Sequence, residues 1–161
     1  MRVGFGYDVH AFDESRELVL GGVSIPDAPG LSGHSDADVV SHAIADALLG
    51  AARLGDLGTL FPNDDRWAGA SSLEILSHTA KAVSDARWSI VNVDATVVAQ
   101  MPKLAPYREE MIDVVAASLG LATSAVWIKG TTTDGLGFTG RTEGIAAMAV
   151  VLIERPDAPI G

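Results

Sequence analysis

The sequence predicts an α+β protein with a mixed β-sheet and helices packed on one face of that sheet. Segments with strand and helix periodicity follow one another in the order hairpin, two helices, strand, helix and two strands. Of the 161 residues, 48% are hydrophobic, which is enough to bury a core in one domain of this length. We assign residues 1–155 to that domain and expect the tail over 156–161 to be disordered.

The N-terminal part of the chain predicts a strand and a hairpin. Val3, Phe5 and Tyr7 alternate with arginine and glycine, which is the pattern of a half-buried strand. Farther along, Gly21 and Gly22 lie between two short apolar runs, so we expect a hairpin that turns on these two glycines.

Two loops and two helices are expected after the hairpin. A loop over 26–33 leads into a helix over about 36–53, which is stopped at Gly55. The next loop, over 56–69, is longer than most connections in compact domains, which makes it a candidate for function. A serine cap then begins a second helix over about 72–87.

The second half of the chain predicts three strands and one helix. Residues 89–99 alternate well and read as a strand, and a turn with two prolines then precedes a helix over about 107–119. A short strand over 125–129 leads into a glycine-rich loop over 130–144. The apolar run over 145–153 predicts a buried strand that completes the sheet.

Composition excludes several classes of protein and partner. The chain has no cysteine, so it has no disulfide framework, thiolate nucleophile or Cys-ligated zinc site. The net charge of −10 disfavours nucleic acid as a partner, and a phosphorylated ligand would need divalent cations to offset that charge. The N-terminus is too polar for a signal sequence, and no apolar run is long enough for a membrane span. We therefore expect a cytoplasmic protein with no membrane partner.

Three residues suggest a metal centre. Asp8 and His10 are two positions apart on the first strand, so their side chains point to the same side. His42 lies on a narrow polar stripe of the first helix, and Asp46, one turn later, could orient its imidazole. One carboxylate and two imidazoles form the three-ligand set of a catalytic zinc. A strand-end ion pair and a solvated helix face remain the alternatives.

A run of three threonines suggests a phosphate site. Thr131, Thr132 and Thr133 follow a strand and offer hydroxyls and backbone N–H groups to phosphate oxygens. High β-propensity of threonine explains the same run without any ligand. Asp134, which comes next, offers a carboxylate oxygen to a hard cation such as Mg²⁺.

Taken together, these motifs resemble the 2-C-methyl-D-erythritol 2,4-cyclodiphosphate synthase family. The similarity runs through GYDVHAF, LGGV, HSDADVVSHAIADALLGAARLGDLGTLFPNDD, NVDATVVAQMPKLAP and TTTDGLGFTGRTEGIA. It implies a homotrimer whose active sites are shared between neighbouring subunits. It also implies a reaction of the non-mevalonate isoprenoid pathway, in which 4-diphosphocytidyl-2-C-methyl-D-erythritol 2-phosphate cyclises and releases CMP.

The resemblance also assigns roles to individual residues. The ligands of Zn²⁺ would be Asp8, His10 and His42, and the residues near the transferring phosphates would be His34 and Thr132. Contacts to the erythritol side would come from Asp56, Leu57, Gly58, Phe61, Pro62, Asn63, Asp64 and Asp65. The cytidine and diphosphate pocket would be built by Ala99, Gln100, Met101, Pro102, Lys103, Leu104, Ala105, Thr131 and Thr133, and further ligand contacts by Ser35, Phe138 and Arg141. A second cation, Mg²⁺ or Mn²⁺, would bridge the diphosphate beside Asp134, which stands where many members carry glutamate.

Three other functions are compatible with parts of the pattern. A zinc-dependent phosphohydrolase would hold an attacking water at the open metal position and would release a linear product. A non-haem iron oxygenase also uses two histidines and one carboxylate, but it would leave the threonine run without a purpose. A trimeric binding module with a structural metal would need four protein ligands, and the pattern offers three.

Overall fold

The computed structural model describes residues 1–33, 35–62 and 70–155. Its five strands form one sheet with the order β2-β1-β5-β3-β4. Their bounds are Arg2–Leu20 for β1, Val23–Leu31 for β2, Ser89–Val98 for β3, Val126–Thr131 for β4 and Gly144–Glu154 for β5. Only β3 and β4 pair in parallel, whereas the other neighbours are antiparallel. The predicted mixed sheet is confirmed.

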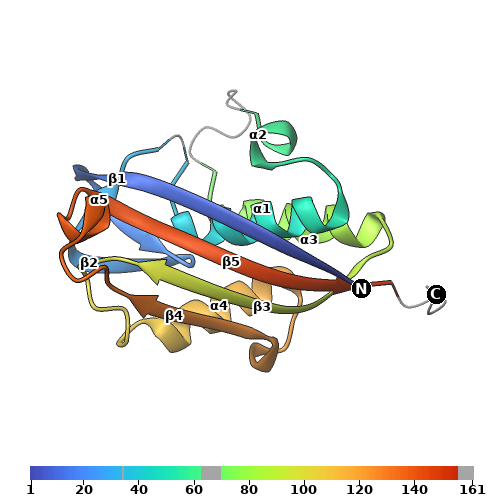
Figure 1. Cartoon of the computed structure of the whole chain (residues 1–161). Helices are drawn as coiled ribbons and strands as arrows, with labels where there is room; N and C mark the ends of the chain where they lie inside the picture. The colour runs from blue at the N-terminus through green and yellow to red at the C-terminus, as the bar shows by residue number, and fades with distance from the viewer. Residues whose placement is uncertain (34, 63–69, 156–161) are drawn as a thin grey trace.

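The long helices cover one face of the sheet (Figure 1). They are α1 (Val39–Ala52), α3 (Ser72–Asp85) and α4 (Arg108–Leu119). The hydrophobic core lies between them and the sheet, with side chains such as Leu20, Leu48, Leu76, Met111 and Ile153 fully buried. In the described part of the chain, no helix is long and apolar enough to cross a membrane.

Several element boundaries differ from the sequence-based expectation. β1 continues far past the expected strand because irregular pairing between Asp13 and Leu18 lets it bend and pair with β2. β2 likewise includes most of the expected loop over 26–33. The expected loops over 56–69 and 130–144 each contain a short helical turn, α2 (Leu57–Leu60) and α5 (Gly137–Gly140). A third turn, η1 (Thr123–Ala125), takes up the first residue of the strand expected over 125–129, and all three are too short to show a period in sequence.

The expected first strand is present, but its apolar side chains point away from the helices and the core of this subunit. Val3, Phe5 and Tyr7 are 67%, 63% and 45% exposed, whereas Gly4 and Gly6 are buried against α1. A Cβ at either glycine would overlap a backbone carbonyl of α1. The helix therefore packs on the glycine side because only glycine allows so close an approach.

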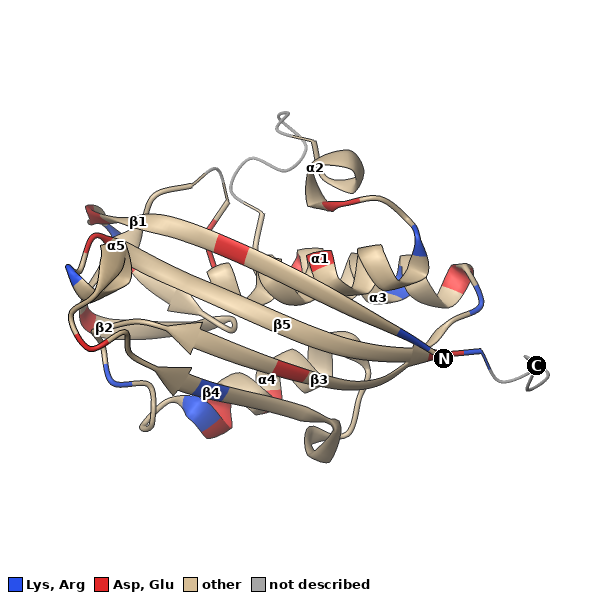
Figure 2. Ribbon diagram, viewed as in Figure 1, with Lys and Arg blue, Asp and Glu red and all other residues tan. Residues whose placement is uncertain are grey.

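The outer face of the sheet is largely apolar. Figure 2 shows only a few charged residues along its strands, and two of them, Lys129 on β4 and Asp94 on β3, form an ion pair. Seven large hydrophobic side chains on these strands are exposed, namely Val3, Phe5, Tyr7, Val9, Trp127, Met148 and Val150. Such a patch on an isolated subunit is typical of an interaction surface.

Candidate active site

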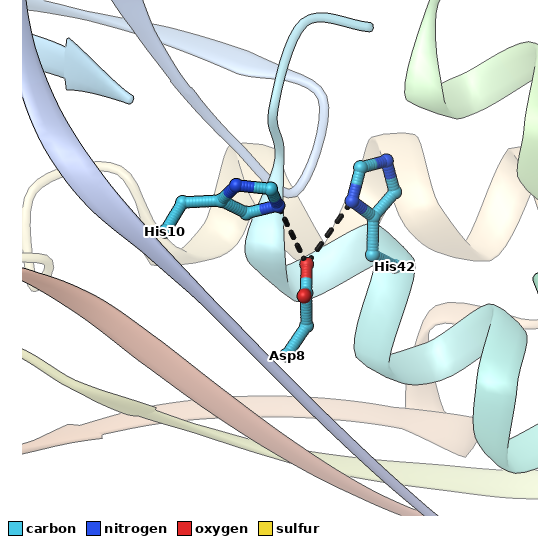
Figure 3. A group of neighbouring side chains, drawn as sticks. All are labelled: Asp8, His10 and His42. Atoms are coloured by element: carbon cyan, nitrogen blue, oxygen red, sulfur yellow. Dashed lines mark hydrogen bonds and ion pairs between the residues drawn. The ribbon is translucent and has the colours of Figure 1, made fainter. Parts of the chain in front are cut away.

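The three expected metal ligands meet beside β1 (Figure 3). Oδ2 of Asp8 is 3.1 Å from Nε2 of His10 and 3.1 Å from Nδ1 of His42. One ligand atom from each residue lies within 4.8 Å of the others. The arrangement follows from the strand, because Asp8 and His10 share the face on which Gly4 and Gly6 let α1 approach. We call these three residues the Asp8 cluster.

The hydrogen bonds of the two imidazoles leave one nitrogen of each facing Asp8. Nδ1 of His10 donates to the carbonyl of Ser32 at 2.5 Å, so its Nε2 faces the carboxylate. Nε2 of His42 is 3.2 Å from the Ser35 hydroxyl, so its Nδ1 does the same. A neutral imidazole that donates from one nitrogen presents a lone pair on the other. The cluster thus presents convergent lone pairs, and this donor set fits a metal ion.

The charge states of the cluster are coupled. Burial by itself would raise the pKa of Asp8, but hydrogen bonds and charge interactions with His10 and His42 outweigh it, so the pKa is lowered. The pKa of His10 is raised, first by its hydrogen bond to Asp8 and against the opposing effect of burial. Asp8 is therefore a carboxylate at neutral pH, while protons compete with a metal for His10.

A buried carboxylate fixes the start of α1 one turn before His42. Asp38 is fully buried and caps the helix by accepting from the N–H groups of Val40 and Ser41. It also accepts from the N–H groups of Gly21 at 2.9 Å and Gly22 at 2.7 Å, which ties the hairpin turn to the helix. Burial raises the pKa of Asp38. The helix consequently begins after Asp38, later than the expected residue 36.

The predicted contact between Asp46 and His42 is wrong. Asp46 instead accepts from the N–H of Leu57 at 2.8 Å and so connects α1 to the first residue of α2. The outer partner of His42 is Ser35, whose hydroxyl lies 3.2 Å from Nε2 of the ring. A stripe on a helix identifies candidates for contact, but a loop that folds over the helix decides which of them is close.

The Asp8 cluster opens into a cavity of about 430 Å³. Among the expected erythritol-side residues, it is lined by Leu57, Gly58 and Phe61, together with Ser35. The other lining residues are Gly33, Asp46 and Ile75, and neither Gly33 nor Ile75 has a reactive group that would single it out in sequence. The remaining expected contacts are placed as follows. Asp56 caps α2 through Thr59, Pro62 is half-buried next to Phe61, and His34, Asn63, Asp64 and Asp65 lie outside the described residues.

A second cavity, of about 260 Å³, lies beside the end of β4. It brings together most of the expected cytidine and diphosphate residues, namely Ala99, Gln100, Pro102, Lys103, Leu104, Ala105, Thr131 and Thr132. Met101 is absent from its lining and is 40% exposed. Arg108 and Gly130 also line it and were not expected, although Arg108 lies only three residues beyond the expected segment.

The glycine-rich loop holds the last group of expected residues. Oδ1 of Asp134 accepts from the Thr132 hydroxyl at 3.0 Å, and Thr133 donates to the carbonyl of Leu136 at 2.5 Å. Arg141 pairs with Glu143 at 2.6 Å, and Phe138 is 37% exposed. Asp134 and Thr133 follow β4 closely, but Thr133 does not line the second cavity. The far end of the loop lies beside β1, where the N–H of Phe12 donates to the carbonyl of Glu143 at 3.0 Å.

The two cavities lie at the same end of the sheet but toward opposite edges. Val9 pairs with Ala146, Ala146 with Val98, and Val98 with Thr131, so these four residues form one row across β1, β5, β3 and β4. Three strand spacings amount to about 14 Å. Within one subunit, the Asp8 cluster and the threonine run are therefore far apart.

Comparison with known proteins identifies the family. The YgbB family matches residues 1–154. A curated relative from Desulfatibacillum aliphaticivorans, named 2-C-methyl-D-erythritol 2,4-cyclodiphosphate synthase, is 54% identical over 96% of this chain and 100% of its own. The bifunctional IspDF from Campylobacter jejuni superposes with a TM-score of 0.92 at 41% identity, over 96% of this chain and 42% of that protein. The CDP complex of IspF from Plasmodium falciparum gives a TM-score of 0.83 at 34% identity, over 96% of each chain.

The fold, the arrangement of the Asp8 cluster and the close similarity over nearly the whole length agree. The chain therefore belongs to the YgbB family, in which its curated relatives are 2-C-methyl-D-erythritol 2,4-cyclodiphosphate synthases.

Proposed function

We propose that three copies of this chain form a ring, in which each active site combines the first cavity of one subunit with the second cavity of its neighbour. The reaction itself follows from the family: cyclisation of 4-diphosphocytidyl-2-C-methyl-D-erythritol 2-phosphate with release of CMP. The chain is thus a lyase of isoprenoid precursor synthesis.

The separation of the two cavities is the observation that carries the proposal. A substrate phosphate cannot contact the Asp8 cluster and the threonine run of one subunit at once when about 14 Å separates them. In a cyclic assembly, one edge of a subunit faces the opposite edge of the next. The apolar outer face of the sheet supports the same assembly, because burial of Phe5, Tyr7 and Val150 between subunits would remove it from water.

We propose Zn²⁺ as the ion held by Asp8, His10 and His42. Three protein ligands leave one position open, as catalytic zinc requires, and the bound ion would supply Lewis-acid polarisation of a phosphate oxygen. We place a second cation, Mg²⁺ or Mn²⁺, beside Asp134, where carboxylate and phosphate oxygens provide the hard ligands it prefers. Both ions would offset the net charge of −10 where the anionic substrate binds.

The remaining chemistry needs position and charge rather than a protein nucleophile. An oxygen of the 2-phosphate attacks the β-phosphorus, and the bond from that phosphorus to the oxygen that stays with CMP breaks. In the second cavity, Lys103 and Arg108 bring positive charge to the diphosphate, and Thr131 and Thr132 donate hydrogen bonds to its oxygens. We assign His34 to the transferring phosphates from the family motif alone. The CDP complex of the Plasmodium falciparum relative supports a cytidine diphosphate pocket.

The product of the purified protein tests the reaction. With the diphosphocytidyl substrate and Mg²⁺, ³¹P NMR should show the cyclic diphosphate together with CMP. A linear bisphosphate would indicate the phosphohydrolase instead, and no turnover with bound metal would indicate a binding module. Light scattering on the same sample should give the mass of three chains.

We propose the cytoplasm as the compartment of this protein, because a chain without cysteine suits reducing conditions.

A further inference from the structure

Arg16 on β1 binds the backbone at two positions, Gly33 and Ser35. The side chain is half-buried and lies in the irregular stretch of β1, six residues beyond His10. Its Nη1 donates to the carbonyl of Gly33, and its Nη2 donates to the carbonyl of Ser35. The two terminal nitrogens of the guanidinium thus each donate to one of two carbonyls, and these carbonyls are two residues apart in sequence.

Ser32, Gly33 and Ser35 contact the two imidazoles of the Asp8 cluster. The carbonyl of Ser32 accepts from Nδ1 of His10, and the Ser35 hydroxyl lies 3.2 Å from Nε2 of His42. Gly33 packs on the His10 ring so closely that a Cβ there would lie 3.1 Å from its Cε1. These three residues therefore contact both rings on the side that faces away from Asp8.

We propose that Arg16 is a positioning residue for the metal centre, acting through Ser32, Gly33 and Ser35. By holding the carbonyls of Gly33 and Ser35, its guanidinium fixes the segment that orients His10 and His42, so that their free nitrogens converge with Asp8. The inference rests on the metal centre proposed above and adds to it the group that holds its outer partners in place.

The chemistry of arginine suits this task. A planar guanidinium presents donors in a fixed fork, which can satisfy two acceptors at once and fix the angle between them. An ammonium group at the same place is a point charge on a flexible stem and does not impose that angle. Partners that orient metal-ligating histidines typically contribute about 10- to 100-fold in metal affinity.

Metal affinity in the absence of substrate tests the proposal. The metal-free parent, Arg16→Met and Arg16→Lys are titrated with Zn²⁺ in competition with a chromophoric chelator. We expect Arg16→Met to lose about 10- to 100-fold in affinity. The matched control is Arg2→Met on the same strand, because Arg2 contacts Ala51 and Trp88 instead, and it should bind like the parent.

A second readout distinguishes positioning from general stabilisation. In metal-free parent, ¹⁵N NMR of His10 should show the proton of the neutral ring on Nδ1, held by Ser32, and Arg16→Met should shift this tautomer toward a mixture. Folded Arg16→Met with the affinity and tautomer of the parent would overturn the proposal. If Arg16→Met does not fold, Arg16→Lys decides, since parental affinity in that variant equally overturns it. A parent that binds no zinc contradicts the metal centre, and the tautomer then decides the role of Arg16.

Discussion

His42 and Asp8 lie 34 residues apart in sequence, yet Nδ1 of the imidazole is 3.1 Å from Oδ2 of the carboxylate. Two features of the chain bring them together. Glycines on β1 allow α1 to pack directly on the strand, and Asp38 fixes where that helix begins. The candidate metal centre is therefore part of the packing between strand and helix rather than a feature of a surface loop.

Replacement of His42 by alanine should abolish turnover and remove one metal ion per subunit. Two ligands, Asp8 and His10, hold zinc far more weakly than three, so we expect the affinity to fall by more than about 100-fold. The core should stay folded, because the imidazole lies in a cavity rather than in the core. Elemental analysis of folded protein that still shows full zinc occupancy would contradict the ligand assignment.

Gly6→Ala should destabilise the protein through the contact between β1 and α1. The added Cβ would overlap the carbonyl of Ala43, so the helix must move, at a cost of about 1–3 kcal/mol or more in the free energy of unfolding. Gly50→Ala on the same helix is the control. A Cβ there has no neighbour within 4 Å, and alanine in a helix should gain about 0.5–1 kcal/mol. Urea unfolding measures both, and equal effects would show that close approach is not required.

Asp134 should affect the second cation only. Asp134→Asn should raise the Mg²⁺ concentration that gives half-maximal activity by about tenfold or more, because a neutral amide is a weaker ligand for a hard cation. Asparagine also tolerates the positive φ of 51° at this position, which alanine does not, so the backbone is preserved. Zinc content should stay unchanged, and Asp134→Glu should leave the Mg²⁺ dependence nearly as in the parent, because it keeps the carboxylate. An unaltered Mg²⁺ dependence would leave Asp134 with only its bond to Thr132.

The pH should act on zinc binding and on metal-free stability with opposite signs. The pKa of His10 is raised above its ordinary value of 6.5, so its stabilising contribution is complete below pH 6.5 and is lost as pH rises through the folded-state pKa. Zinc needs the unprotonated ring, so its affinity should rise over that same range, by at most about tenfold per pH unit for one proton. The lowered pKa of Asp8 affects stability only in acid, because its stabilising contribution is complete above the ordinary value of 3.8 and is lost as the pH falls below it.

Two titrations across this range check both signs. Zinc affinity and the urea midpoint of the metal-free protein are measured between about pH 6 and pH 8. His10→Gln is the reference, because the difference from the parent isolates His10 from the other histidines. A metal-free parent whose stability rises relative to His10→Gln with increasing pH would contradict the assigned shift.

Phe5→Lys should dissociate the proposed ring. The side chain is 63% exposed on the apolar outer face, and a lysine there would carry charge into an interface between subunits. We expect light scattering to report a smaller species that still binds zinc but turns over no substrate. Ser77→Lys, on the exposed side of α3, is the control and should remain assembled and active. A Phe5→Lys variant with full activity as a monomer would exclude the shared site.

Periodicity predicted the long elements of the fold but not the direction in which β1 faces. Val3, Phe5 and Tyr7 form an alternating apolar pattern, which marks a buried side without saying what buries it. In this subunit the helix covers the glycine side instead. Sequence patterns of a single chain do not distinguish a side that packs on its own helix from one that packs on another copy.

The candidate ligands could be predicted because the sequence has only four histidines, and one of them shares a strand face with Asp8. Their supports could not. Ser32 acts through a backbone carbonyl, Gly33 through the lack of a side chain, and Arg16 through a bulge that no pattern indicates. Such contacts depend on how loops fold over the strand, which is set by tertiary structure.

The placement of the two cavities has a genetic consequence. The first cavity is built mainly from the N-terminal part of the chain, and the second from residues 99–132. In the proposed ring, a chain defective in the first cavity and a chain defective in the second are each inactive alone. Every mixed trimer of the two, however, contains one junction at which both contributing cavities are intact. Two null alleles that map to opposite edges of the sheet should therefore complement each other, whereas two that map to the same edge should not.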